Sequence, residues 1–352
     1  MKGIILHGGH GTRLRPLTHT GPKQLLPIAN KPMSEYCVET LSSAGIKEIA
    51  FIIGGIGSKK VKEYYGDGEK FGVKFTYIQQ DSPRGIAHAV SLCKDFVNNE
   101  KFVVFLGDNI IQRKINDYIL DFEKSDALAS LLLCKVNNPS QFGIAEIENN
   151  KIIKITEKPK NPPTNLAVTG IYFLTPYIFE VIKKLKPSWR NELEIADALQ
   201  ILIDDDKKII YGMITDFWKD TGTPNDIIEA NKIILENMPE SFEGKKENNV
   251  VIEGKIIVGK GTIIKNGVKI VGPIIIGENC IIEGNTVIGK NTSIGENSHL
   301  NDCNISNSII MSNCTVNGKL DIKNSIIASN SKIVKDQNEK KFLLGEGTQI
   351  SL

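Results

Sequence analysis

The stretch Ile276-Gly-Glu-Asn-Cys-Ile-Ile282-Glu-Gly-Asn-Thr-Val-Ile288-Gly-Lys-Asn-Thr-Ser-Ile294 carries an aliphatic residue at every sixth position. The same step continues on both sides of this stretch without a break. A period of six matches neither the 3.6-residue period of a helix nor the two-residue alternation of a strand. It is typical of a coil of three short strands whose apolar residues point to a common axis. The aliphatic positions are Ile252, Val258, Ile264, Ile270, Ile276, Ile282, Ile288, Ile294 and Leu300.

Small residues around the repeat support this interpretation. Glycine often follows the aliphatic residue, and a small or β-branched residue often precedes it by two positions. The step slips within residues 302–309 and resumes at Ile310, Val316 and Ile322, which indicates an inserted loop or a skipped corner. A β-sandwich would require the unbroken series to arise by chance. We therefore expect an all-β parallel β-helix of hexapeptide repeats over residues 250–352, with a C-terminal tail, 341–352, that forms a final strand.

The chain before residue 239 follows a different pattern, in which short apolar runs alternate with amphipathic stretches. This alternation predicts an α/β domain with a doubly wound parallel sheet. Three runs that lie close together suggest an added antiparallel section. Strands are expected at 4–6, 48–53, 74–78, 102–106, 129–135, 144–148 and 152–156, and helices at 34–44, 59–65, 85–93, 194–203 and 225–236. We expect a catalytic domain over 1–238 and a polar linker over 239–249.

Composition excludes several classes of protein. The 43 basic and 41 acidic residues leave a net charge of +2, so there is no basic surface for nucleic acid. No apolar run approaches the ~20 residues of a membrane span. The first residues, MKGIILHGG, predict a buried strand and not a signal peptide. The 6 cysteines form no CxxC motif, as expected for reduced thiols in a cytoplasmic protein.

A glycine-rich segment follows the first predicted strand. Gly8, Gly9 and Gly11 allow the backbone to approach a ligand closely, and their N–H groups can surround an anion. Arg13 adds a permanent positive charge that suits phosphate oxygens, and Lys23 adds a second. The spacing fits neither a P-loop nor a dinucleotide-binding fingerprint. The segment nevertheless lies at the sheet edge where doubly wound folds bind ligands.

Together with other blocks, this segment resembles the sugar-1-phosphate nucleotidylyltransferase family, and within it the long form of the glucose-1-phosphate thymidylyltransferases. The blocks occur in family order over nearly the whole first domain. They are Gly8-Gly-His-Gly-Thr-Arg-Leu-Arg-Pro-Leu-Thr18, Pro22-Lys-Gln-Leu-Leu-Pro27, Asn30-Lys-Pro32, Gln80-Asp-Ser-Pro-Arg-Gly85, Leu106-Gly-Asp-Asn109, Glu157-Lys-Pro159, Val168-Thr-Gly-Ile-Tyr172, Glu192-Leu-Glu194 and Trp218-Lys-Asp-Thr-Gly222.

The resemblance implies a fold and a reaction. The fold is a Rossmann-like, doubly wound mixed sheet of the nucleotide-diphospho-sugar transferase type, followed by a left-handed parallel β-helix. The reaction is an in-line attack by the phosphate of glucose 1-phosphate on the α-phosphate of dTTP, with Mg²⁺ as cofactor. Because both reactants are anions, catalysis consists mainly of charge neutralisation and alignment.

The resemblance also implies roles for individual residues. The catalytic residues are Arg13, Lys23 and Asp108, and the metal ligands are Asp108 and Asp220. The nucleotide is bound by Leu6, Gly8, Gly9, Gly11, Thr12, Arg13, Lys23, Gln24, Gln80, Pro83, Gly85 and Asp108. The sugar phosphate is bound by Asn109, Gly143, Glu157, Lys158, Val168, Thr169, Gly170 and Trp218.

Three positions depart from the family pattern or allow a second interpretation. His7 stands where relatives usually have a small residue, and we expect it to pack near the nucleoside; with His10 it lacks a third ligand for zinc. Phe142 stands where many relatives have tyrosine. Arg190 could bind phosphate, but a salt bridge to Glu192 or Glu194 is the favoured interpretation.

Three alternatives to thymidylyl transfer remain open. The enzyme could prefer UTP, since one methyl group on the base is worth only ~1 kcal/mol. The β-helix could carry an acetyltransferase site that uses His299, its one histidine, as the base. The chain could also be a non-catalytic regulatory subunit. In each case the strand edges of the β-helix are expected to be covered in a homo-oligomer.

Overall fold

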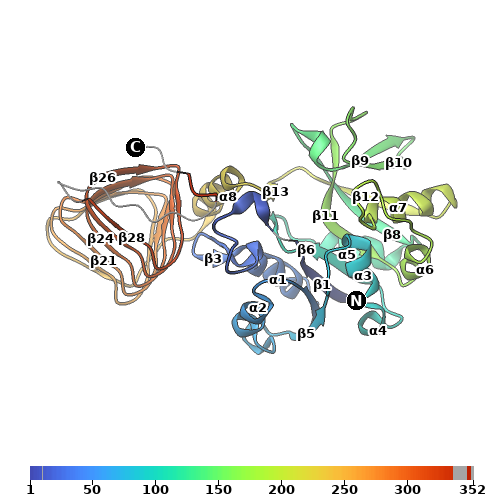
Figure 1. Ribbon diagram of the computed structural model, residues 1–352, viewed down its shortest axis with the longest axis horizontal. Helices are drawn as coiled ribbons and strands as arrows, with labels where there is room; N and C mark the ends of the chain where they lie inside the picture. Colours follow the sequence, from blue (N-terminus) through green and yellow to red (C-terminus); the bar gives the residue numbers. More distant parts are fainter. Residues whose placement is uncertain (10, 336–346, 350–352) are drawn as a thin grey trace. The chain divides into compact units, whose positions relative to one another are not determined.

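The computed structural model describes residues 1–9, 11–335 and 347–349, so His10 and most of the predicted tail strand lie outside the described residues. The chain forms two compact units (Figure 1). The first unit comprises Met1–Gly11, Thr18–Leu25 and Met33–Asp220. The second comprises Thr12–Leu17, Leu26–Pro32 and the chain from Thr221 onwards. Two short N-terminal segments therefore belong with the C-terminal part of the chain.

The first unit is a mixed sheet in the order β10-β9-β11-β6-β1-β4-β5, to which β8 and β12 are added beside β11. Its strands are β1 (Lys2–His7), β4 (Glu48–Ile53), β5 (Lys74–Gln79), β6 (Phe102–Leu106), β8 (Ala129–Lys135), β9 (Gly143–Glu148), β10 (Lys151–Glu157), β11 (Leu166–Leu174) and β12 (Ile209–Ile214). The β6-β1-β4-β5 section is parallel, and β11 runs antiparallel to β6, β8 and β9. This arrangement is the predicted Rossmann-like fold with an antiparallel addition.

Helices cover both faces of this sheet. They are α1 (Met33–Ser43), α2 (Ser58–Tyr65), α3 (Ile86–Ser91), α4 (Lys94–Val97), α5 (Asn116–Lys124), α6 (Ile178–Ile182) and α7 (Ile195–Asp204). Alternate residues of β1 enter two separate cores, because side chains alternate across a strand. Ile4 and Leu6 pack with α3, α4, α6 and α7, whereas Ile5 packs with α1, α2 and α5.

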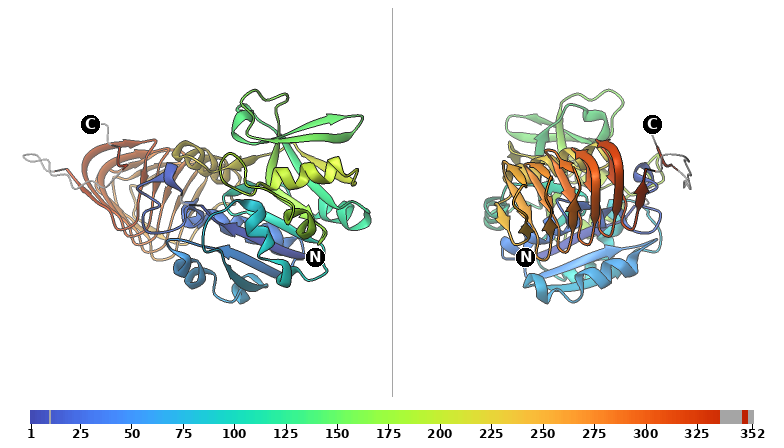
Figure 2. Two further views of the ribbon diagram at one scale, coloured as in Figure 1. Left: turned by 45° about the vertical axis from the view of Figure 1, so that its right-hand side comes forward. Right: turned by 90° about the vertical axis from the view of Figure 1, so that its left-hand side faces the viewer.

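The second unit is a stack of short parallel strands (Figure 2). They are β14 (Ser241–Phe242), β15 (Lys245–Lys246), β16 (Val251–Glu253), β17 (Ile256–Val258), β18 (Ile263–Ile264), β19 (Lys269–Val271), β20 (Ile274–Ile276), β21 (Ile281–Glu283), β22 (Val287–Ile288), β23 (Thr292–Ile294), β24 (His299–Ser306), β25 (Ile309–Ile310), β26 (Thr315–Lys323), β27 (Ile326–Ile327) and β28 (Lys332–Val334). Ile252 pairs with Ile270, and Ile270 with Ile288, so one coil spans three hexads. The aliphatic positions form one core, in which Ile252 and Ile322 are partly buried, as the repeat predicts for a β-helix.

The slip in the repeat proves to be a shortened coil without an inserted loop. Ile276 pairs with Ile294, but Ile294 pairs with Ile310, two residues fewer along the chain. Strand β24 runs continuously through this region and pairs with both β21 and β22. A corner has therefore been skipped, which is one of the two predicted outcomes.

Hydroxyl and thiol side chains fill the corners of the coils. Thr262 donates to the carbonyl of Gly277 at 2.6 Å and accepts from the N–H of Cys280 at 2.9 Å. Thr286 and Thr292 are also fully buried and bond to corner carbonyls. Buried backbone groups need partners, so small polar residues two positions before the aliphatic residue satisfy the turns.

The segment 239–249, which the sequence predicts as a linker, carries β14 and β15. These two strands pair with β17 and β18 and so form the beginning of the β-helix. The helix α8 (Pro224–Asn237) precedes them and belongs to the same unit. No helix in the described part of the chain has the length and apolarity needed to cross a membrane.

Candidate active site

The sheet register brings three of the sequence blocks to one edge. Leu6 pairs with Leu106, His7 with Ile53, and Ile53 with Gln79. The strands are parallel, so the segments that follow them leave the sheet at the same edge. These segments carry Gly8, Gly9 and Gly11 after β1, Gln80 after β5 and Asp108 after β6.

Lys23 and Asp108 form a partly buried ion pair at this edge. Lys23 begins the short helix η2 (Lys23–Leu25), and its ammonium contacts the Asp108 carboxylate. The other carboxylate oxygen accepts from Asn109 Nδ2 at 3.0 Å. Burial acts to raise the pKa of Asp108, but Lys23 and Asn109 outweigh it and hold that pKa below its usual value. Asp108 is therefore a carboxylate at neutral pH.

Asp220 is brought next to Asp108 by a two-stranded ladder. Strand β13 (Trp218–Asp220) pairs antiparallel with β7 (Asn109–Ile111), and Asp220 stands opposite Asn109. Asp220 thus stands opposite the residue that follows Asp108. No three His, Cys, Asp or Glu side chains cluster as a metal cage within the described residues. Two carboxylates fit Mg²⁺, which completes its shell with water and substrate phosphates.

Arg13 lies in the second unit, in the short helix η1 (Thr12–Leu14), which Thr12 begins. Its guanidinium packs against Gly222, where a Cβ would lie 3.0 Å from Nη2. Gly222, two residues after Asp220, thus leaves room for the Arg13 guanidinium.

Gln24 and Gly8 form a polar contact beside the loop. Gln24 Nε2 donates to the carbonyl of Gly8 at 3.1 Å. Its Oε1 is buried and has no hydrogen-bond partner among the described residues. Gly107 lies against the same group, since a Cβ there would lie 3.1 Å from Gln24 Cγ. A buried amide oxygen without a partner is costly, so this atom is a candidate for ligand binding.

His7 packs into the core behind the loop. Its ring makes edge contacts with Phe51 and Tyr65, at centroid distances of 5.0 and 6.1 Å. Neither ring nitrogen has a hydrogen-bond partner within the described residues. Burial lowers the pKa of His7 to about 3, although Asp108 opposes the shift. His7 is therefore a neutral core residue.

The Gln80 block is fixed by hydrogen bonds and by one constrained glycine. The Gln80 carboxamide lies 2.8 Å from His88 Nδ1, and Arg84 Nη2 lies 2.7 Å from His88 Nε2. Gly85 has φ 96° and ψ 168°, a conformation open essentially to glycine alone. A Cβ there would lie 2.4 Å from the Leu193 carbonyl oxygen. Pro83 lies in the exposed loop between them.

The sugar-side residues gather around an irregularity in β11. The pairing of β11 with β8 shifts between Val168 and Tyr172, a stretch that includes Thr169 and Gly170. Gly170 N donates to Asn109 Oδ1 at 3.3 Å, and Trp218 Nε1 donates to the same oxygen at 2.8 Å. Asn109 also donates to Asp108, so its carboxamide links three neighbouring groups, and its contact with the sugar phosphate stays a prediction. The Trp218 ring meets Phe142 edge-on at 5.4 Å.

Glu157 and Lys158 lie next to this irregularity. Glu157 stands opposite Gly143 in the β9–β10 ladder, and its carboxylate is shared between Lys158 at 3.6 Å and Arg190 at 3.3 Å. Burial raises the pKa of Glu157. Arg190 also bridges Glu192 at 3.0 Å and Glu194 at 3.5 Å, which confirms the structural interpretation of that arginine.

The sequence did not single out two groups that the structure places here. Tyr172 is buried, and burial raises its pKa, with smaller contributions from Glu157 and Asp108. His88 lies in helix α3 and Arg84 lies just before that helix, four positions earlier in the chain.

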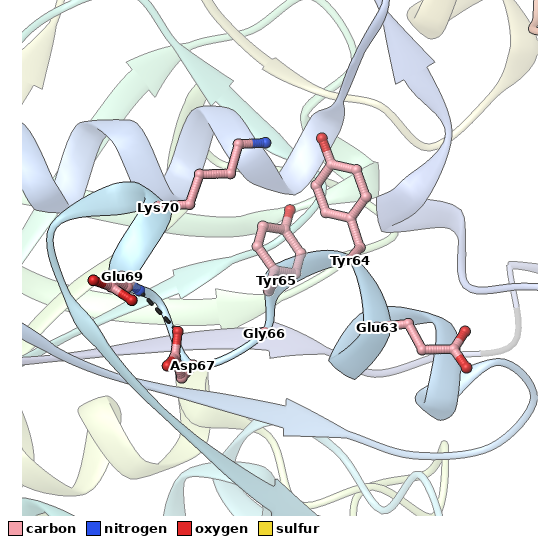
Figure 3. A pocket seen from close by; sticks show the side chains of 7 residues that line it. All are labelled: Glu63, Tyr64, Tyr65, Gly66, Asp67, Glu69 and Lys70. Atoms are coloured by element: carbon pink, nitrogen blue, oxygen red, sulfur yellow. Dashed lines mark hydrogen bonds between the residues drawn. The ribbon is translucent and has the colours of Figure 1, made fainter.

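A surface depression lies elsewhere in the first unit, at the end of α2 (Figure 3). It contains three carboxylates against one lysine, a balance that repels phosphate groups, and no predicted site residue. Its lining residues are Glu63, Tyr64, Tyr65, Gly66, Asp67, Glu69 and Lys70.

His299 lies on the outer surface of the β-helix in a row of charges. Its Nε2 lies 2.7 Å from Glu283 Oε1, and the other oxygen of Glu283 bonds to Lys265. This row resembles the cross-strand ion pairs of exposed sheet faces. Acyl transfer at His299 stays a prediction.

Comparison with known proteins identifies two family matches. The nucleotidyl transferase family matches residues 2–237, and the GMPPB C-terminal domain matches residues 270–351. The first match therefore contains every residue predicted for catalysis and binding.

Several curated proteins are similar in sequence. The chain is 47% identical over 257 residues to the low-salt glycan biosynthesis nucleotidyltransferase Agl11 of Haloferax volcanii, covering 73% of this chain and 72% of that protein. It is 38% identical to the glucose-1-phosphate thymidylyltransferase of Streptomyces antibioticus over 100% of this chain and 99% of that one. The bifunctional protein GlmU of Methanocaldococcus jannaschii is 37% identical over 75% of this chain and 61% of its own length.

Two solved structures resemble the chain. One is a putative glucose-1-phosphate thymidylyltransferase from Bacillus anthracis in complex with a sucrose, with a TM-score of 0.64 and 42% identity over 69% of this chain and 98% of that chain. The other is UDP-glucose pyrophosphorylase complexed with UDP-glucose, with a TM-score of 0.61 and 28% identity over 67% of this chain and 99% of that chain.

Proposed function

The chain belongs to the nucleotidyl transferase family and is a nucleotidyltransferase, and from that premise we propose that it converts dTTP and glucose 1-phosphate to dTDP-glucose and pyrophosphate. One observation carries the proposal. Lys23, Asp108 and Asp220 come from three distant segments and converge beside the glycine-rich loop. A cation and two carboxylates at a phosphate-binding edge suit a reaction between two phosphates.

The reaction needs no covalent intermediate. A phosphate oxygen of glucose 1-phosphate attacks the α-phosphorus of the triphosphate, and the bond from that phosphorus to the bridging oxygen breaks. Pyrophosphate leaves with the electron pair. The nucleophile is already ionised, so the protein has to align it and offset the repulsion between the two anions.

Lys23 is suited to the leaving side. In the free protein its charge is offset by Asp108. Asp108 would hold the metal ion and Lys23 would contact phosphate oxygens in the substrate complex, so each charge would keep a partner in this partly buried place. Arg13 follows the same loop in the chain and is proposed as the second cation.

Mg²⁺ is proposed to be held by Asp108 and Asp220. When bound, it neutralises negative charge on the phosphates and helps to orient them. The two carboxylates remain in place through the Asn109 hydrogen bonds and the β7–β13 ladder.

The sugar phosphate is proposed to lie along the irregular part of β11. Lys158 would bind its phosphate, and Glu157 would accept hydrogen bonds from sugar hydroxyls. The backbone from Val168 to Gly170 and Gly143 are proposed to lie against the sugar ring. A Cβ at Gly143 would lie 3.2 Å from Glu157 Oε2 and would crowd that carboxylate.

The test is pyrophosphate release by the purified chain with Mg²⁺, measured for a panel of triphosphates and sugar 1-phosphates. We expect dTTP with glucose 1-phosphate to give the highest kcat/KM and UTP to follow. A uridine preference would move the proposal to uridylyl transfer. No release with any pair would refute it and favour a regulatory subunit.

Acyl transfer is a second candidate, favoured only by the contact of His299 with Glu283. Its test is thiol release from acetyl-CoA in the presence of glucosamine 1-phosphate. Release that disappears in His299→Ala would support it, and absence of release would remove it.

A further inference from the structure

His88, in helix α3, is held at both ring nitrogens. Arg84 lies 2.7 Å from Nε2, and the Gln80 carboxamide lies 2.8 Å from Nδ1. A guanidinium can only donate hydrogen bonds, so Nε2 must be the acceptor. In a neutral imidazole the other nitrogen then carries the proton, and Nδ1–H donates to Gln80.

The ring is neutral near pH 7. Burial and then the Arg84 charge lower the pKa of His88, while Asp81 opposes them. Gln80 must therefore offer an acceptor to the ring. The oxygen and nitrogen of a carboxamide have the same shape, so the hydrogen-bond network decides which one faces His88. With Nε2 of Gln80 against Nδ1–H, as the two atoms are assigned at 2.8 Å, two donors would meet. The network therefore requires the two ends of the carboxamide to be exchanged, so that the Gln80 oxygen accepts from Nδ1–H and the N–H₂ group points the other way.

The outward end of Gln80 lies beside the glycine-rich loop. A Cβ built on Gly8 would lie 3.4 Å from the atom assigned as Gln80 Oε1, which is the position that the N–H₂ group takes once the two ends are exchanged. Gln80 follows β5 at the sheet edge where nucleotides bind in doubly wound folds. A 4-oxo pyrimidine presents an acceptor at its edge, whereas a 4-amino pyrimidine presents a donor. A fixed N–H₂ group would bond the first and repel the second.

We infer that Arg84 and His88 fix the orientation of the Gln80 carboxamide, and so select a triphosphate with a 4-oxo pyrimidine over one with a 4-amino pyrimidine. This inference rests on the proposed function and adds a selection rule to it. His88 and Arg84 are positioning residues, because they act on the base only through Gln80.

Two substitutions of similar size separate this role from a packing role. In His88→Glu the carboxylate can only accept, so it bonds Arg84 and takes the N–H₂ group of Gln80, which turns the Gln80 oxygen toward the base. In His88→Gln the carboxamide accepts from Arg84 and donates to Gln80, which keeps the native orientation. The measurement is the ratio of kcat/KM for dTTP to that for CTP.

We expect His88→Glu to lower this ratio by about 10- to 100-fold, the range for one reversed base contact. His88→Gln is expected to keep the wild-type ratio. A wild-type ratio in a folded His88→Glu variant would overturn the inference.

Two readouts do not depend on turnover. Nitrogen-15 NMR of the histidine rings should give the Nδ1–H form for His88, and the Nε2–H form would overturn the inference. If the wild type releases no pyrophosphate with any triphosphate, the proposed function fails. The inference about Gln80 is then tested by the equilibrium affinities of the wild type for dTTP and CTP. Equal affinities of the wild type for the two would count against the inference.

Discussion

Asp108 and Asp220 can be tested one charge at a time. Asp108→Asn and Asp220→Asn each keep the shape of the side chain but remove a charge from the proposed metal site. We expect kcat for pyrophosphate release to fall by about 100- to 1,000-fold in each, the usual effect of losing one group that stabilises transition-state charge. Circular dichroism should show an intact fold.

The matched control is Asp126→Asn. Asp126 is exposed and pairs with Lys208 on the surface. Its loss should leave kcat unchanged, since exposed ion pairs contribute little. A wild-type rate in either of the first two variants would contradict the metal assignment.

His7 predicts a pH dependence of stability. Its pKa is lowered from 6.5 to about 3 in the folded protein, so between these values the unfolded chain binds a proton that the folded chain does not. Stability contributed by neutral His7 is present above pH 6.5 and is lost as the pH falls. Between pH 7 and pH 5 the loss is about 2 kcal/mol. In urea unfolding, the free energy of unfolding of His7→Ala should fall less between pH 7 and pH 5 than that of the wild type. The same fall in both proteins would disprove the lowered pKa of His7.

The chemistry at these positions was only partly accessible from sequence. The glycine-rich loop and Arg13 could be predicted because glycine and arginine have distinctive local uses. The approach of Asp220 to Asp108 depends on a ladder of two three-residue strands, too short to leave a pattern. The Arg84–His88–Gln80 contacts were missed because they depend on which atom donates, a property that no periodicity encodes.

Gly85 is the point where the loop after β5 depends on one backbone conformation. Gly85→Ala would place Cβ 2.4 Å from the Leu193 carbonyl oxygen, at φ 96° and ψ 168°. We expect a loss of about 1–3 kcal/mol in urea unfolding. The KM for the triphosphate should rise, because Gln80 belongs to the same loop.

Gly72→Ala is the control for this substitution. Gly72 also has positive φ, at 66°, but nothing lies within 4 Å of a Cβ built there. Gly72→Ala should lose less free energy of unfolding than Gly85→Ala, and its KM for the triphosphate should not change. Equal effects of the two variants on KM would show that the close approach of Gly85 to the Leu193 carbonyl does not position the loop after β5.

Helices and strands were predictable where the signal was local. The predicted helix 225–236 corresponds to α8, and the predicted helix 59–65 corresponds to α2. Strand β11 was not predicted, although its residues stood out as a motif. It is buried on both faces and has an irregular register, so neither alternation nor a turn marks it.

The division of the chain into units was less accessible from sequence than either fold. The slip in the hexapeptide step located the shortened coil because the step itself is regular. Nothing local in Thr12–Leu17 or Leu26–Pro32 indicates that these segments belong with the β-helix. Their membership depends on contacts with residues more than 200 positions later, such as that between Ala29 and Asn231.

Asn231, on α8, holds one of these segments. Its Oδ1 accepts from the N–H of Ala29 at 2.8 Å and from Ser293 Oγ at 2.6 Å, and its Nδ2 donates to the Asn291 carbonyl at 3.1 Å. Ala29 is at the turn between β2 (Pro27–Ile28) and β3 (Lys31–Pro32). Strand β2 begins four residues after Lys23 in the chain. Ala29, Asn231 and Ser293 are buried, so water cannot readily replace a lost partner there.

Asn231→Ala should therefore loosen the turn that follows Lys23 in the chain, and Asn231 is not among the proposed substrate-binding residues. Leaving buried groups without partners costs about 1–3 kcal/mol, so hydrogen exchange of the Ala29 amide should accelerate by about 10- to 100-fold. We expect kcat for pyrophosphate release to fall as well, because the turn continues directly from Lys23 and Gln24. Asn237→Ala, an exposed position on the same helix, should change neither quantity. Unchanged hydrogen exchange of the Ala29 amide in Asn231→Ala would show that the β-helix does not hold this turn. Faster exchange with an unchanged kcat would show that the β-helix holds the turn but that catalysis does not depend on it.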